Sequence, residues 1–190
     1  MSQENKTKTI LQHPDIRLRM VCNEVQDDEF GSEELMNVSK YLINSLYHSG
    51  GIGLAAPQIG IDRRVFVVKY KAFGNDTFET YVNPQIEIAG KEMFSFKEGC
   101  LSIPGVFATV RRPKNIIVTA RKVNGTEFTH EASGLMSTVI QHEYDHLNGV
   151  EFIDRLSKLK KKRLAEKLMK DKGKINENYL SIVKELRSNA

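Results

Sequence analysis

The chain has 190 residues, of which 40% are hydrophobic and 27% charged, and this fits one compact domain with little room for a second. Its formal net charge is only +4, but the basic residues concentrate near the C-terminus. No apolar run is long enough to cross a bilayer, and residues 1–8 do not resemble a signal peptide, so we expect no membrane partner. Two cysteines are too few for a disulfide scaffold, which favours a reducing compartment. We therefore expect a cytoplasmic protein.

A helix is the first element that the sequence predicts. Ser32 can cap it, two glutamates follow in its first turn, and apolar residues recur at helical spacing until Gly50 or Gly51 ends it. The next stretch, residues 51–60, is rich in glycine and alanine. Such residues let a backbone approach another backbone or a ligand closely, although a tight structural turn has the same composition.

The middle of the chain predicts an antiparallel sheet. Short runs of strand-forming residues alternate with turn-forming residues, which is typical of strands joined by hairpins. The predicted strands cover residues 64–70, 78–82, 85–89, 92–96, 116–123 and 127–131. A turn is expected at residues 74–76, and Asn124 and Gly125 form a pair that tight hairpin turns prefer. Residues 98–105 are expected to form a loop that carries Cys100.

The following helix carries a His-Glu-x-x-His motif at residues 142–146. Two histidines four residues apart share one helical face and can hold one metal ion. Glu143 stands beside the first of them, where it can take a proton from water. So short a motif also occurs by chance, and these would then be ordinary core or surface side chains. We interpret His48 and His130 as structural.

Two imidazoles leave a tetrahedral ion in need of a further ligand. Cys100 is the best candidate, because a metal would deprotonate its thiol and a free cysteine in that loop has no other evident use. A Cys100, His142 and His146 set with an open position and a neighbouring carboxylate describes metal-assisted hydrolysis.

Residues 155–190 are predicted to be a helical extension of a catalytic domain that covers residues 1–154. The first helix of the extension, residues 155–170, combines a leucine stripe with many lysines and is therefore basic and amphipathic. A second helical segment is expected at residues 176–187. The basic face can meet an acidic partner such as RNA, or it can be solvated while the leucines pack on the core.

Three stretches together resemble the signature motifs of bacterial peptide deformylases. They are Gly-Ile-Gly-Leu-Ala-Ala-Pro-Gln at residues 51–58, Glu-Gly-Cys-Leu-Ser at 98–102, and Gln-His-Glu-Tyr-Asp-His-Leu-Asn-Gly at 141–149, in matching order and spacing. The similarity runs from about Ile10 to about Asp154. It implies an α+β fold in which antiparallel sheets surround the helix with the histidines, and a reaction that removes formate from N-formylmethionyl nascent peptides.

The resemblance also implies a role for each matching residue. The same three ligands would bind the metal, and Glu143 would act as general base and then as general acid. Gln58 and the backbone N–H of Leu101 would donate hydrogen bonds to the formyl oxygen. Gly53 would pair with the backbone of the substrate. An apolar pocket for the methionine side chain would be lined by Ile52, Phe96, Leu135, Thr138 and Val139.

The thiolate and imidazole ligands alone suggest zinc. The resemblance implies Fe²⁺ as the most active ion, with Zn²⁺ or Ni²⁺ as substitutes. We expect Arg112 to orient Asp145 behind the ligands, because metal-bound histidines need support. The basic C-terminal helix resembles one that docks on the ribosome in this family, and attraction to ribosomal RNA near the exit tunnel is a physical reason for such docking.

Two positions depart from the common pattern of the family, because Gly105 and Phe107 stand where many relatives carry glutamate and arginine. Contacts with substrate residues beyond methionine are therefore open, and a relative that acts on another N-acyl group is one alternative. A zinc endopeptidase shares the histidine motif but usually takes its third ligand after it. An RNA-binding module with a structural metal is a further alternative, and it would not require Glu143.

Overall fold

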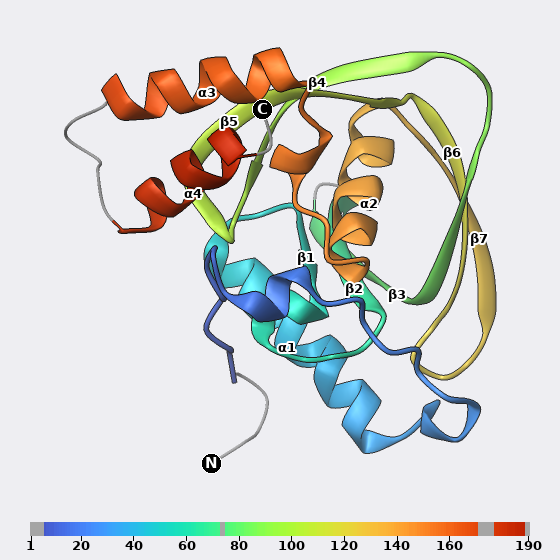
Figure 1. The fold of residues 1–190 in the computed structure, drawn as a ribbon. Coiled ribbons are helices and arrows are strands. Elements are labelled where there is room, and N and C mark those ends of the chain that lie inside the picture. Colours follow the sequence, from blue (N-terminus) through green and yellow to red (C-terminus); the bar gives the residue numbers. More distant parts are fainter. Residues whose placement is uncertain (1–5, 73–74, 171–176, 189–190) are drawn as a thin grey trace.

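The computed structural model describes residues 6–72, 75–170 and 177–188 (Figure 1). The helices are α1 (Glu33–Ser49), α2 (Gly134–Leu147), α3 (Lys158–Lys170) and α4 (Glu177–Ser188). The strands are β1 (Gly53–Ala55), β2 (Val65–Ala72), β3 (Asn75–Ile88), β4 (Met93–Cys100), β5 (Ile103–Pro113), β6 (Asn115–Arg121) and β7 (Glu127–Ser133). They form a five-stranded sheet in the order β1-β2-β3-β6-β7 and a two-stranded sheet, β4-β5, with antiparallel pairing throughout. The predicted α+β fold with antiparallel sheets is confirmed.

Helix α1 begins and ends where the sequence predicts. The Ser32 hydroxyl accepts a hydrogen bond from the backbone N–H of Leu35 at 3.2 Å, which satisfies one of the free donors of the first turn. Gly50 ends the helix with φ at 70°, a left-handed conformation that favours glycine. The apolar stripe of α1, including Leu42 and Leu46, is fully buried.

Strand β2 is buried on both faces, and this places the larger sheet between two helices. Val65 and Val67 share a core cluster with the apolar stripe of α1. Phe66 and Val68 point to the other face and share a cluster with residues of α2. Figure 1 shows α2 enclosed between this sheet and the β4-β5 hairpin.

Two predictions about the strands were wrong. The strands expected at 78–82 and 85–89 are one strand, β3, whose register shifts between Val82 and Gln85. Asn83 takes up the irregularity with φ at 48°, and its side-chain amide exchanges hydrogen bonds with the backbone of Val25. Residues 98–105 are not a single loop, because β4 continues to Cys100 and β5 begins at Ile103. Of the turn expected at 74–76, Gly74 lies outside the described residues, and Asn75 and Asp76 already belong to β3.

The C-terminal helices share a core with the β4-β5 hairpin. The cluster combines side chains from β5, from the 3-10 turn Phe152–Arg155 and from both helices, among them Val106, Phe152, Leu164 and Ile182. The domain boundary expected between residues 154 and 155 falls inside that turn. Residues 171–176 and 189–190 of the expected extension lie outside the described part of the chain. Among the described residues, no helix has the length and apolar character that spanning a membrane requires.

The N-terminal segment ties two parts of the molecule together before α1 begins. The N–H of Leu11 donates to the carbonyl of Gln58 at 2.7 Å, and the N–H of His13 donates to the carbonyl of Ser102 at 2.9 Å. Gln58 lies in the 3-10 turn Ala56–Ile59 after β1, and Ser102 lies in the turn after Cys100. These two turns border the candidate site.

Candidate active site

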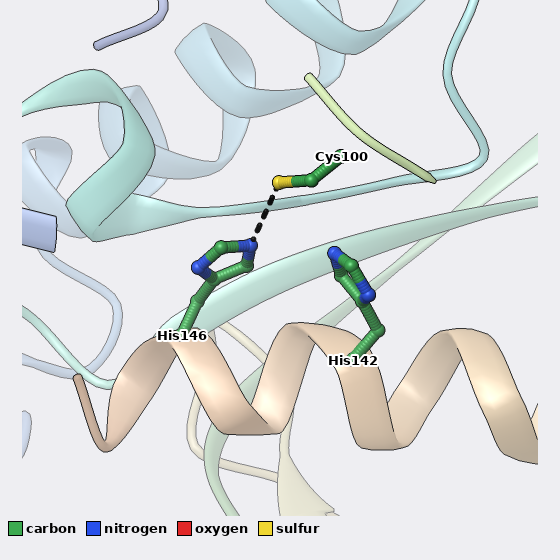
Figure 2. Close-up of side chains that lie close together, drawn as sticks. All are labelled: Cys100, His142 and His146. Carbon is green, nitrogen blue, oxygen red and sulfur yellow. Dashed lines mark hydrogen bonds between the residues drawn. The ribbon is translucent and has the colours of Figure 1, made fainter. Parts of the chain in front are cut away.

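The three predicted metal ligands lie together. His142 and His146 project from α2 toward Cys100 at the end of β4 (Figure 2). One ligand atom of each residue lies within 4.8 Å of the other two, and the Cys100 Sγ is 3.3 Å from the His146 Nε2. Such a separation is close to that expected for two ligands of one tetrahedral ion, given bonds of roughly 2.0 to 2.3 Å.

The electrostatic surroundings fit a divalent cation. The Nδ1 of His142 lies 2.9 Å from the Glu98 carboxylate, which can only accept, so this nitrogen donates and Nε2 remains available to a metal. Burial opposes a charge on His142, but the Cys100 sulfur and Glu98 raise its pKa well above its usual value, so positive charge is favoured at this point and a metal ion bound there would replace the proton. Burial lowers the pKa of His146 well below its usual value, which keeps that imidazole neutral as a ligand must be.

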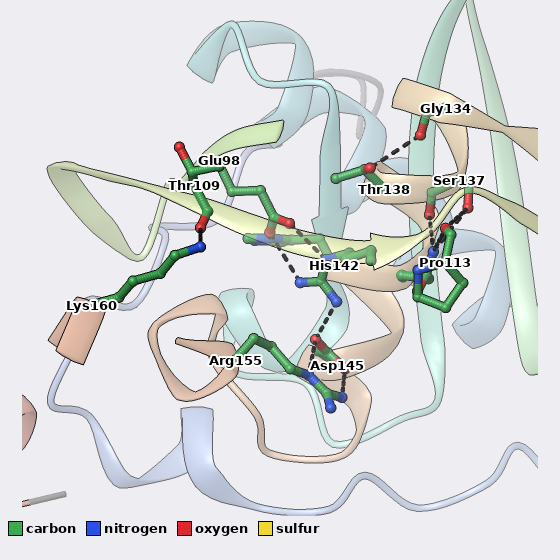
Figure 3. Close-up of polar contacts among 12 residues, drawn as sticks. Glu98, Thr109, Pro113, Gly134, Ser137, Thr138, His142, Asp145, Arg155 and Lys160 are labelled. Carbon is green, nitrogen blue, oxygen red and sulfur yellow. Dashed lines mark hydrogen bonds and ion pairs between the residues drawn. The ribbon is translucent and has the colours of Figure 1, made fainter. Parts of the chain in front are cut away.

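A buried ionic network supports the ligand helix from behind (Figure 3). Arg112 binds both oxygens of Glu98, with Nε at 2.6 Å and Nη2 at 3.0 Å, and its Nη1 donates to Asp145 at 2.8 Å. Arg155 also donates to Asp145, at 3.0 Å through Nε. Burial opposes ionisation of Glu98, yet hydrogen bonds from His142 and Arg112 hold its pKa below the usual range. The contact predicted between Arg112 and Asp145 is present.

Glu98 is a site residue that the sequence analysis did not identify. It lies inside a motif that was recognised, but no role was predicted for it. A signal was present, because Glu98 precedes Cys100 by two positions on a strand, and residues two apart share a face of a strand. Its two partners, Arg112 on β5 and His142 on α2, are distant in sequence, so only the fold reveals the network.

The Glu143 carboxylate stands in a nearly closed environment. The residue is 4% exposed, and its Oε2 has no hydrogen-bond partner among the described residues. Burial raises its pKa to about 7, which suits a group that must both accept and return a proton near neutrality. Gly53 leaves room for it, because a Cβ at that position would lie 2.7 Å from the Glu143 Cδ.

Gln58 is held so that its amide nitrogen faces the site. Its Oε1 accepts a hydrogen bond from the N–H of Ala55 at 2.9 Å, which fixes the orientation of the amide group. The Nε2 then lies 3.1 Å from the Ser102 hydroxyl and 3.5 Å from the Cys100 sulfur. The N–H groups of the Gln58 amide therefore point toward the space beside the expected metal position.

A cavity of about 530 Å³ opens in front of these groups. It is lined by all of the residues predicted to bind or act on substrate, namely Ile52, Gly53, Gln58, Phe96, Leu101, Leu135, Thr138, Val139 and Glu143. Cys100 and His142 also line it, whereas His146, Arg112 and Asp145 lie behind its surface. Gly105, Phe107 and Lys97 also line the cavity. The sequence analysis connected Gly105 and Phe107 with contacts to substrate residues beyond methionine, whereas it gave Lys97 no role.

A cysteine thiol and two imidazoles lie around one point, beside an apolar cavity and a buried carboxylate with one oxygen that has no donor among the described residues. This combination is typical of a metal-dependent hydrolase. The model of the family described as polypeptide deformylase matches residues 7–162. The chain therefore belongs to the peptide deformylase family, metal-dependent hydrolases that remove the N-formyl group from nascent peptides.

Individual relatives agree with the family match. A peptide deformylase of Saccharophagus degradans is 39% identical over 163 residues, which cover 85% of this chain and 91% of the relative. The crystal structure of Arabidopsis thaliana peptide deformylase 1B with an inhibitor is similar with a TM-score of 0.77 at 34% identity, covering 85% of this chain and 88% of that one. A Met-Ala-Ser-bound peptide deformylase from Acinetobacter baumannii gives a TM-score of 0.74 at 26% identity, covering 80% and 99%.

Proposed function

We propose that this protein hydrolyses the formyl amide of N-formylmethionyl peptides at the site formed by Cys100, His142 and His146. The observation that carries the proposal is the convergence of these three side chains on one point, with Glu143 buried beside them. A divalent ion held there would supply Lewis acidity toward water and the formyl carbonyl. We propose Fe²⁺ as the working ion, with Zn²⁺ or Ni²⁺ as substitutes, since thiolate and imidazole donors accept all three.

Each residue of the site then has a separate role in the proposed reaction. Glu143 accepts a proton from the attacking water and returns it to the departing amine, so that the C–N bond breaks and formate and a free amino terminus result. The Gln58 amide and the Leu101 N–H donate to the formyl oxygen while it gains negative charge. The Gly53 backbone aligns the peptide. The methionine side chain enters the apolar part of the cavity, between Ile52, Phe96, Leu135, Thr138 and Val139.

The proposed substrate arises on translating ribosomes, which supports a cytoplasmic location. The basic face of α3 supports a second proposal, that the protein docks near the ribosomal exit tunnel. Lys158, Lys162, Arg163, Lys167 and Lys170 are exposed on this helix, while Leu164 and Leu168 are buried. The apolar side of this helix packs on the core, so its basic side chains face solvent. They can bind an acidic partner, and they suit the phosphates of RNA.

Formate release from formyl-Met-Ala-Ser by protein purified without oxygen tests the catalytic proposal, with the bound ion identified in the same sample. We expect Glu143→Gln to retain the ion and to lower kcat by ~10²- to 10⁴-fold, the usual contribution of a general base. Acetyl-Met-Ala-Ser should not be hydrolysed at a comparable rate. Equal turnover of the acetyl peptide would favour the relaxed relative that Gly105 and Phe107 leave open, and cleavage of an internal peptide bond would favour an endopeptidase.

A further inference from the structure

The lining of the catalytic cavity contains a cation that the proposed reaction does not use. Lys97 on β4 lines the cavity and is exposed, which places this residue where the cavity meets solvent. Its neighbour Glu98 is buried and supports the metal ligands. Because side chains alternate along a strand, Lys97 lies on the outward face of the β4-β5 hairpin.

Phe107 keeps the Lys97 side chain beside this opening. Phe107 lies opposite Gly99 in the register of β4 and β5. A Cβ at position 99 would lie 2.5 Å from the Phe107 Cε1, so the ring occupies space that a side chain on residue 99 would fill. The Lys97 Nζ is 5.6 Å from the centroid of the same ring, a distance at which an aromatic ring attracts an ammonium group.

The charge of Lys97 is not neutralised by an ion pair within the described part of the chain. Strands β4 and β5 carry four charged residues, and two of them, Glu98 and Arg112, pair with each other at 2.6 Å on the buried face. The other two, Lys97 and Arg111, are both cations and both exposed. The outward face of the hairpin is therefore positive.

The cavity also has no free acidic group near its opening. Among the described residues that line it, the carboxylates are Glu98 and Glu143. Glu98 is bound by Arg112 and His142, and Glu143 is only 4% exposed. Gly105 stands where many relatives carry glutamate and contributes no charge. Outside the proposed metal site, Lys97 is therefore the accessible charge that the described lining offers to a peptide.

We propose that Lys97 makes the enzyme prefer substrates with an acidic side chain at the second or third residue. The inference rests on the proposed function, in which the methionine fills the apolar part of the cavity. Each further residue of an extended peptide adds about 3.3 Å, so the next two residues approach the opening. An ion pair there forms equally in the ground state and the transition state, so it lowers KM and leaves kcat unchanged.

Formate release from paired peptides tests this preference at low salt. One pair is formyl-Met-Glu-Ser-amide and formyl-Met-Lys-Ser-amide, and the other is formyl-Met-Ala-Glu-amide and formyl-Met-Ala-Lys-amide. The amides remove the terminal carboxylate, which would itself attract Lys97. We expect kcat/KM to favour glutamate by ~3- to 10-fold in at least one pair, because an exposed charge attracts one peptide and repels the other. The difference should lie in KM and shrink in 0.5 M NaCl.

Two variants and a control assign the preference to Lys97. Lys97→Gln should bring the paired values close to equality, and Lys97→Glu should reverse their order. Lys91→Glu is the matched control, because Lys91 is exposed just before β4 and does not line the cavity; it should keep the wild-type preference. The ratio of two peptides measured on one sample does not depend on how much of the protein is active.

Equal values within both pairs, with formate released, would overturn this inference and leave the proposed function standing. A preference for lysine, or a preference for glutamate that persists in Lys97→Gln, would overturn it as well. Release of no formate from any of the four peptides would contradict the proposed function, and the inference would fail with it.

Discussion

At the scale of single residues, the active site depends on the absence of a side chain at position 53. The Glu143 carboxylate occupies the space in which a Cβ of residue 53 would lie, so the glycine and the proposed base are matched to each other. The conformation of the Gly53 backbone does not itself require glycine, since φ is not positive there. The requirement is therefore steric, and it can be tested separately from folding.

Gly53→Ala should displace Glu143 and lower kcat/KM for formyl-Met-Ala-Ser by ~10²-fold, the loss that an error of about 1 Å in a reacting group can cause. The metal content should not change, because the three ligands are not displaced. Gly51→Ala is the control, since the atoms nearest to a methyl group there belong to the Leu46 and Leu101 side chains and not to Glu143. Similar losses in both variants would show that Gly53 has no special relation to Glu143.

The second cysteine differs sharply from Cys100. Cys22 is buried in the core cluster beneath α2, and burial raises the pKa of its thiol from 9.0 to about 11. At pH 8 only about 0.1% of such a thiol is thiolate, the form that reacts. Because the unfolded chain loses this proton first, the shift also lowers folding stability as the pH rises from about 9 to about 11.

Native protein treated with iodoacetamide at pH 8 should therefore remain unlabelled at Cys22, as read by peptide mass spectrometry. The labelling rate should rise about tenfold per pH unit below the thiol pKa while the fold persists. Labelling in urea at pH 8 serves as the positive control. Rapid reaction of native protein at pH 8 would mean that the thiol is neither enclosed nor protonated as the structure indicates.

At the scale of elements, the sequence predicts the helices and hairpins whose ends are marked by capping or turn residues close by in the chain. The cap at Ser32, the glycine at position 50 and the Asn124-Gly125 turn all act within a few residues, and the helix and hairpin they define are present. Strand β5 was missed because it contains Pro104, Gly105 and Pro113, which disfavour a central strand. It tolerates them because it lies in a sheet of only two strands.

The candidate site likewise contains residues that sequence motifs predict and contacts that only the fold reveals. The ligands, Glu143 and Gln58 lie in motifs that can be read along the chain, and the structure brings them together. The hydrogen bonds of Glu98 and of His13 join residues from distant elements, so these partners could not be predicted. The link between Arg112 and Asp145 was expected, whereas the more direct link from Arg112 through Glu98 to His142 was not.

Arg112 joins β4, β5 and α2, so its loss should affect the metal. Arg112→Ala leaves Glu98 and Asp145 without their buried cation, which should cost about 3 to 5 kcal/mol of stability. It should also weaken metal retention by ~10- to 100-fold, as is usual for groups that support ligands. Metal content after dialysis and thermal unfolding measure the two effects.

Arg155→Ala is the control for this prediction. Arg155 also binds Asp145, but its side chain is 50% exposed and it does not touch Glu98. It should therefore lose much less metal. Unchanged metal affinity and turnover in Arg112→Ala would contradict the proposed role of that residue.

At the scale of the whole molecule, the C-terminal helices combine a packed apolar face with the exposed basic face of α3. Their apolar faces complete the core under β5, so deleting them would expose that core as well as remove the basic surface. Ribosome binding is therefore better tested by changing charge alone. Lys162 and Lys167 are exposed, and neither belongs to the core cluster.

Replacing Lys162 and Lys167 with glutamine should weaken binding to ribosomes and flatten its dependence on salt. The logarithmic slope should fall by about 0.7 to 0.9 for each phosphate that the helix no longer neutralises. Deformylation of a free peptide should not change. The control replaces Lys71 and Lys122, which lie outside α3. Equal binding by both double variants, measured by sedimentation at several salt concentrations, would reject docking through this helix.

The fastening of residues 11–13 has a consequence for how each copy is made. These residues leave the ribosome early, but Gln58, Ser102 and Glu151, to which they bond, are synthesised later. Docking of the segment must therefore wait for Glu151, which follows His13 by 138 positions. The N-terminal segment of a growing copy can therefore be fastened in full only after the ligand helix α2 has been synthesised.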